Sequence, residues 1–148
     1  VYGFGPSFHY KGFDFSFFFQ GVAKTSLFMS GLQPFGTMME NKNVQKFIAD
    51  DRWSPENQNI FAEYPRLTIE RSANNSTTST YWERNGAFLK LKNAEIGYTF
   101  KSMRLYLRGS NLLTFSKFKL WDPEQGGGNG LKYPTQRVFN IGFQMTIK

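Results

Sequence analysis

Charged side chains at strand-like and turn-like positions are the first candidates for chemistry in this sequence. Arg104 and Arg108 are four residues apart, so in an extended strand they share one face. They could line a path for a substrate or pair with Glu95 across a hairpin, and the pattern favours structural pairing. The carboxylates of Asp50-Asp51 and Asp122-x-Glu124 could bind calcium through oxygen ligands, but Asp-Pro is also an ordinary turn opener. We therefore predict no metal site and no cofactor.

Three tryptophans are the other candidates for ligand contact: Trp53, Trp82 and Trp121. All fall in expected loops or at the ends of expected strands. An aromatic side chain there could stack on a sugar or a peptide, or belong to the aromatic girdle of a membrane barrel. Girdle or local packing is the favoured interpretation, so these residues and the two arginines are weak candidates only.

Composition excludes most catalytic chemistry. The chain has no cysteine and one histidine, which rules out a disulfide framework and a cysteine nucleophile and leaves little material for acid-base catalysis. His9 is interpreted as a strand residue beside Tyr10. The glycine cluster 126–130 lacks the lysine and spacing of a phosphate loop. We predict that the chain is not an enzyme.

The stretch Asn85 to Phe115 carries the strongest structural signal. Two runs rich in β-forming residues flank Lys101-Ser102, and each alternates apolar with polar or small residues, which predicts a hairpin with a very short turn. One face is apolar, formed by Ala94, Ile96, Tyr98, Phe100, Met103, Leu105 and Leu107. The alternation changes phase before Asn93, which indicates either a bulge near Lys92 or a strand that leaves its apolar surroundings there.

A second hairpin is expected around Lys11-Gly12, with a stripe formed by Phe13, Phe15, Phe17 and Phe19. The chain is interpreted as one segment, 1–148, with strands at about 2–10, 12–20, 87–100, 103–114 and 137–147. Long loops are expected at 21–86 and 115–136. Within the first loop, 43–49 could form a short amphipathic helix, and the polar stretch 72–80 is expected to be a mobile tip.

Short and long connections alternate along the chain, which is typical of outer-membrane barrels with short periplasmic turns and long extracellular loops. The net charge of +7 and the 18% aromatic content would also suit a soluble β-sandwich or OB-like module binding nucleic acid or carbohydrate. The phenylalanines, however, cluster on one strand face, which favours contact with lipid. We predict no nucleic-acid partner and keep the soluble module as the alternative.

Several motifs resemble one protein family and occur in the same order nearly end to end. They are YKGFDFSFFFQG, DRWSPEN, YPRLT, FLKLKNAEIGYTF, RLYLRGSNLLTFSKF, WDPE and YPTQRVFNIGFQ. Their wording is similar to the C-terminal part of SusC/RagA-like transporters, the TonB-dependent outer-membrane barrels of Bacteroidetes. Val1 is expected to be a cut or processed start, and the natural chain could continue beyond Lys148.

This resemblance implies an all-β fold, an antiparallel up-and-down segment of a 22-stranded transmembrane barrel. It implies active import of large nutrients, oligosaccharides or oligopeptides, across the outer membrane with energy delivered through TonB. The implied partners are a SusD-like surface lipoprotein, outer-membrane lipid, and TonB through parts of the transporter outside this chain. The long loops are then the expected places for contact with the lipoprotein or the substrate.

Overall fold

The computed structural model describes residues 1–29, 44, 46–68 and 72–147. The chain divides into two compact units. The first comprises Val1–Leu27, Asn85–Gly126 and Lys132–Lys148, and the second comprises Phe28–Arg84 and Gly127–Leu131.

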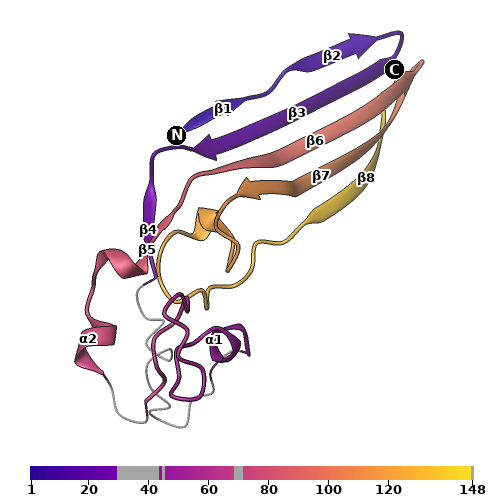
Figure 1. Ribbon diagram of the computed structural model, residues 1–148. Helices are drawn as coiled ribbons and strands as arrows, with labels where there is room; N and C mark the ends of the chain where they lie inside the picture. The colour runs from indigo at the N-terminus through magenta and orange to yellow at the C-terminus, as the bar shows by residue number, and fades with distance from the viewer. Residues whose placement is uncertain (30–43, 45, 69–71, 148) are drawn as a thin grey trace. The chain divides into compact units, whose positions relative to one another are not determined.

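The described part of the first unit is built on a six-stranded antiparallel sheet (Figure 1). Its strands are β1 (Tyr2–Phe4), β2 (Ser7–Tyr10), β3 (Phe13–Val22), β6 (Phe88–Phe100), β7 (Met103–Ser116) and β8 (Val138–Met145). Both β1 and β2 pair with β3, one after the other, and the order then continues through β6 and β7 to β8. The fold of the described residues is therefore mostly β, with antiparallel pairing throughout this sheet.

The expected strand 2–10 is broken in the structure. Gly5 and Pro6 separate β1 from β2, because proline has no N–H to donate to the β-ladder. The carbonyl of Pro6 still accepts a hydrogen bond from the Phe17 N–H at 3.3 Å. The interruption therefore ends regular pairing without detaching this edge from β3.

The expected loop 21–86 contains more regular structure than its sequence indicates. In the structure β3 continues to Val22, and short strands β4 (Ser26–Phe28) and β5 (Glu83–Asn85) pair with each other. Two short helices, α1 (Lys46–Asp50) and α2 (Ala73–Ser76), and a 3-10 turn, η3 (Thr80–Trp82), belong to the second unit. The helix expected at 43–49 thus begins at Lys46, while 43 and 45 lie outside the described residues. The stretch 72–80 contains α2, which Ser72 caps, and the mobility expected for this stretch stays a prediction.

Two-residue turns join β2 to β3 and β6 to β7 at one end of the sheet (Figure 1). Lys11 and Gly12 both have positive φ, 44° and 86°, as a tight hairpin turn requires. A Cβ on Gly12 would also lie 2.7 Å from the Thr99 carbonyl oxygen. The connections 23–87 and 117–137 leave from the opposite end, and the second contains η4 (Pro123–Gln125).

The two faces of this sheet differ sharply in polarity. Rows of residues in register cross four strands, and one such row is Phe15, Ile96, Leu107 and Ile141. All four are exposed, Ile141 to 81%. A soluble sandwich would bury this face under a second sheet, and nothing among the described residues does so. Among those residues no helix has the length and apolar character needed to cross a membrane.

Of the two interpretations of the phase change before Asn93, the bulge near Lys92 is confirmed. Asn93 lies opposite Phe18 while Leu91 lies opposite Phe19, so Lys92 has no partner on β3. This extra residue restores the phase, and Leu91 joins the face that carries Phe19. On β7 an extra residue near Asn111, whose φ is 55°, compensates for the shift.

Candidate functional site

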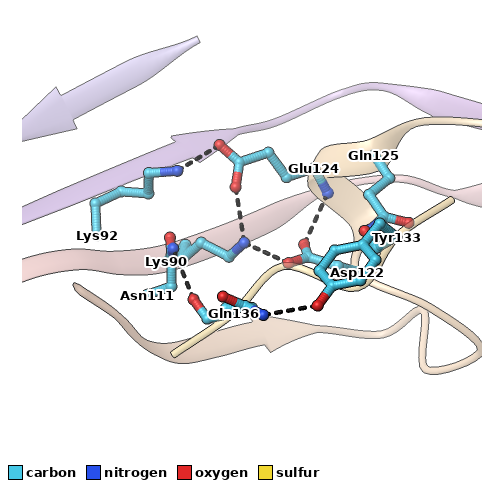
Figure 2. Close-up of polar contacts among 8 residues, drawn as sticks. All are labelled: Lys90, Lys92, Asn111, Asp122, Glu124, Gln125, Tyr133 and Gln136. Atoms are coloured by element: carbon cyan, nitrogen blue, oxygen red, sulfur yellow. Dashed lines mark hydrogen bonds and ion pairs between the residues drawn. The ribbon is translucent and has the colours of Figure 1, made fainter. Parts of the chain in front are cut away.

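A buried lysine holds the connection between β7 and β8 against the sheet. The Lys90 side chain is only 1% exposed, and its Nζ donates to Asp122 Oδ2 at 2.5 Å and to Glu124 Oε2 at 2.7 Å. The neighbouring Lys92 Nζ donates to Glu124 Oε1 at 2.7 Å. Figure 2 shows the two lysines converging on the carboxylates. We refer to Lys90, Lys92, Asp122 and Glu124 as the loop clamp.

The sequence WDPE shapes its own side of the loop clamp. Asp122 caps η4, since its Oδ1 accepts a hydrogen bond from the Glu124 N–H at 3.1 Å, and Pro123 suits the first position of such a turn. Gly126 ends the turn with a φ of 75°. The indole Nε1 of Trp121 donates to the Gly126 carbonyl at 2.9 Å. These contacts aim both carboxylates in one direction.

The ion pairs keep both carboxylates charged. Burial alone would raise the pKa of Asp122, but hydrogen bonds from Lys90 and from the Glu124 backbone outweigh burial and hold that pKa below its usual range. The pKa of Glu124 is likewise lowered, because hydrogen bonds from Lys90 and Lys92 outweigh burial. The calcium role considered for Asp122-x-Glu124 is thus replaced by lysine binding. Among the described residues no group of metal ligands forms a metal site.

Further polar contacts extend from the loop clamp along the same connection (Figure 2). Gln125 Nε2 donates to the Tyr133 carbonyl at 2.8 Å, and Gln136 Nε2 donates to the Tyr133 hydroxyl at 2.8 Å. Asn111 Nδ2 donates to the Gln136 carbonyl at 3.0 Å. These bonds tie the start of the connection to its end and to β7.

A second ionic cluster lies on the polar face of the sheet. Arg104 binds the Asp14 carboxylate through two nitrogens and Glu95 Oε1 through Nη2 at 2.7 Å. Its guanidinium lies 4.9 Å from the centroid of the Tyr106 ring. A Cβ on Gly97 would lie 2.7 Å from the arginine and the aspartate, so the cluster occupies the space above that glycine. The predicted pairing of Arg104 with Glu95 is confirmed.

Arg108 lies directly opposite Glu95 in register, but among the described residues it makes no ion pair. Its side chain remains on the polar face and exposed. A role for Arg108 in a substrate path stays a prediction.

The second unit contains a cavity of about 390 Å³. Its walls combine aromatic rings with amides and hydroxyls: Ala62, Tyr64, Pro65, Asn74, Asn75, Thr77, Ser79, Tyr81 and Trp82. Burial, and after it the charge of Glu63, raises the pKa of Tyr64 and Tyr81, so both remain neutral. The described residues of the cavity lining therefore carry no charge.

The tryptophan candidates separate in the structure. Trp82 is buried and lines this cavity, whereas Trp121 packs edge-on against Phe118 and belongs to the loop clamp's surroundings. Trp53 bonds through its backbone N–H to the Tyr64 carbonyl at 3.0 Å. Lys90, Lys92, Asn74 and Asn75 were not among the functional residues predicted from the sequence. For the two lysines the available signal was the alternation Leu-Lys-Leu-Lys in an apolar strand, because a lysine there needs a nearby carboxylate.

Comparison with known proteins addresses the origin of this sheet and its long connections. The chain is 30% identical to TonB-dependent receptor P26 of Formosa agariphila over 99% of its own length. It is 26% identical to TonB-dependent receptor SusC of Bacteroides thetaiotaomicron over 92% of its length. The chain is homologous to SusC/RagA-type TonB-dependent receptors. The resemblance inferred from the motifs is confirmed.

This homology covers a segment of the receptors. The chain spans about a sixth of the length of the curated relatives it matches, 17% of receptor P26 and 14% of SusC. No family model matches the chain. This chain, the receptor segment, aligns over 97% of its length with part of the RagAB peptide transporter structure, at a TM-score of 0.72 and 23% identity. The two therefore share a fold over this segment. The names of these relatives describe receptors and a transporter, not enzymes.

Proposed function

We propose that this receptor segment forms part of the wall and extracellular loops of a 22-stranded outer-membrane barrel, towards its C-terminal end. In this proposal the apolar face of β3, β6, β7 and β8 contacts lipid and the polar face lines the lumen. The exposed apolar rows that cross four strands carry the argument, because so large an apolar surface requires a covering partner. One outer edge of the sheet is formed by β1 and β2, and the other by β8; each edge pairs with a neighbouring strand of the complete wall.

The complete receptor imports a large nutrient, an oligosaccharide or an oligopeptide, with energy delivered through TonB. The connections 23–87 and 117–137 lie on the extracellular side and contact substrate or a SusD-like surface lipoprotein. The homology to receptors of this type and the fold shared with the RagAB peptide transporter support this assignment. The loop clamp gives the second connection a fixed base on the barrel wall.

Adjacent residues of β8 test the face assignment, since a strand points successive side chains to opposite sides. Ile141→Cys and Asn140→Cys would be spin-labelled separately in the full-length receptor, in a background without other accessible cysteines, and reconstituted in a bilayer. We expect a label at 141 to collide preferentially with dissolved oxygen, which concentrates in lipid. The label at 140 should collide preferentially with a water-soluble nickel complex. The reverse pattern, or equal water access at both positions, would refute the proposed wall.

Import is tested in cells that produce the receptor. Growth on the imported nutrient should fail when TonB is deleted, and a surface lipoprotein should copurify with the receptor. Import that persists without TonB would contradict the energetic part of the proposal and leave the face assignment standing.

A further inference from the structure

The cavity in the second unit has the size of a small-molecule site. Its volume of about 390 Å³ lies at the lower end of the range for ligand pockets, roughly 300–1,000 Å³. Its described lining residues combine aromatic rings with amides and hydroxyls, and none of them has a charged side chain. Glu63 and Arg84, whose charges act on the pKa of Tyr64 and Tyr81, bind each other at 2.7 Å, and the Arg84 guanidinium lies 6.0 Å from the centroid of the Tyr81 ring. Among the described lining residues a ligand therefore meets polar groups and no charged side chain.

The aromatic rings of Tyr81 and Trp82 in the cavity lining are held in place before any ligand binds. Trp82 Nε1 donates a hydrogen bond to the Asn75 carbonyl at 3.0 Å. The Trp82 ring contacts the Tyr81 ring edge-on, with 4.8 Å between the ring centroids. The Tyr81 hydroxyl donates to the Glu63 carbonyl. The Tyr81 side chain nevertheless remains 43% exposed. A fixed and accessible ring lowers the entropy cost of binding.

The asparagines of the cavity lining, Asn74 and Asn75, offer both hydrogen-bond donors and acceptors. Each asparagine amide supplies two N–H donors and a carbonyl acceptor, and no described residue forms a hydrogen bond with the side-chain amides of Asn74 and Asn75. The backbone that carries them is fixed, since Ser72 Oγ accepts from the Asn75 N–H at 3.4 Å. Thr77 Oγ1 donates to the Ala73 carbonyl at 2.8 Å. The backbone that carries these amides is therefore held in place, and the amides are available.

We propose that this cavity binds a neutral carbohydrate, and this rests on the proposed function as an importer of large nutrients. A sugar ring has one face of C–H groups, which suits the ring of Tyr81, and a rim of hydroxyls, each both donor and acceptor, which suits the amides of Asn74 and Asn75. The absence of a charged side chain among the described lining residues disfavours uronic acids and sulfated sugars. It also disfavours peptide segments rich in lysine, aspartate or glutamate.

The test is calorimetric titration of the purified full-length receptor with maltoheptaose, laminarihexaose and xylohexaose, with a tryptic digest of casein as the peptide probe. We expect at least one oligosaccharide to bind. The double variant Asn74→Ala/Asn75→Ala should weaken that binding by at least about tenfold, as expected for the loss of two groups of hydrogen bonds. Tyr81→Ala should weaken it comparably, whereas Tyr81→Phe, which keeps the ring, should retain most of it.

The matched control is Asn57→Ala, which removes the same exposed amide from the same unit outside the cavity lining and should leave binding unchanged. Equal affinity of the wild type and the double variant would overturn the proposed site. Binding of casein peptides but of no oligosaccharide would overturn the proposed ligand class. Either result, obtained with a receptor that passes the spin-label and TonB tests, would leave the importer function standing.

Discussion

Replacing Lys90 by methionine should release the connection between β7 and β8 from the sheet. Methionine keeps most of the volume and removes the charge that binds Asp122 and Glu124. Losing one partner of a fully buried ion pair costs about 3–5 kcal/mol. The carboxylates here are 18% and 30% exposed and Glu124 keeps Lys92, so we expect a local cost of about 2–3 kcal/mol.

Hydrogen exchange in the full-length receptor measures this cost where it arises. The backbone N–H groups of Gln125 and Gly126 are bonded within η4, and their exchange through local opening should accelerate by about 30- to 150-fold.

Lys92→Met is the matched control, because it removes one partly exposed contact and should change exchange only severalfold. Adding Asp122→Asn and Glu124→Gln to Lys90→Met should recover much of the protection, because no carboxylate is then left without Lys90, and Lys92, which loses Glu124, is partly exposed. Unchanged exchange in Lys90→Met would show that the loop clamp does not anchor this connection.

Two further outcomes are expected. The folded-state pKa values of Asp122 and Glu124 lie below their ordinary values of 3.8 and 4.5. The stability that these carboxylates contribute is therefore present above about pH 4.5 and is lost as the pH falls through the depressed values. Hydrogen exchange at η4, corrected for intrinsic rates, should accelerate only in acid. Phe15→Lys and Phe143→Lys should each lower the folding stability by about 2–4 kcal/mol where the residue lies near the bilayer midplane, and should reduce the heat-modifiable folded band on gels. A receptor with Asn140→Lys, on the polar face, should assemble normally.

Much of the sheet could be predicted because its signals are local. Alternation over a dozen residues defines the faces of β6 and β7, and short polar turns such as Lys11-Gly12 define the hairpins. The phase change before Asn93 indicated an irregularity at Lys92, either a bulge or a strand leaving its apolar surroundings, and the structure shows the bulge. Each of these features depends on neighbours within one strand or hairpin.

The ionic clusters and the cavity depend on distant residues and could not be read from local pattern. Asp14 and Arg104 are separated by 90 positions, and either could have paired with other charges on the same face. The pairing of β4 with β5 likewise follows from tertiary pairing of weakly patterned segments. The cavity needs Tyr64, Asn75 and Tyr81 brought together by a unit whose sequence has no period.

The bulge and the loop clamp are best understood as one device. Without the extra residue at Lys92, strict alternation would place Leu91 on the polar face and Lys90 on the apolar face. The bulge instead puts Lys90 opposite Gln20 and Thr114, on the face from which it can reach Asp122 and Glu124. It also leaves Lys92 free of its strand partner and directed at Glu124. A single irregularity in β6 thus supplies both cations that hold the connection. Deleting Lys92 should therefore loosen the connection more than Lys92→Met does, since deletion also reverses the side of the sheet that Lys90 occupies.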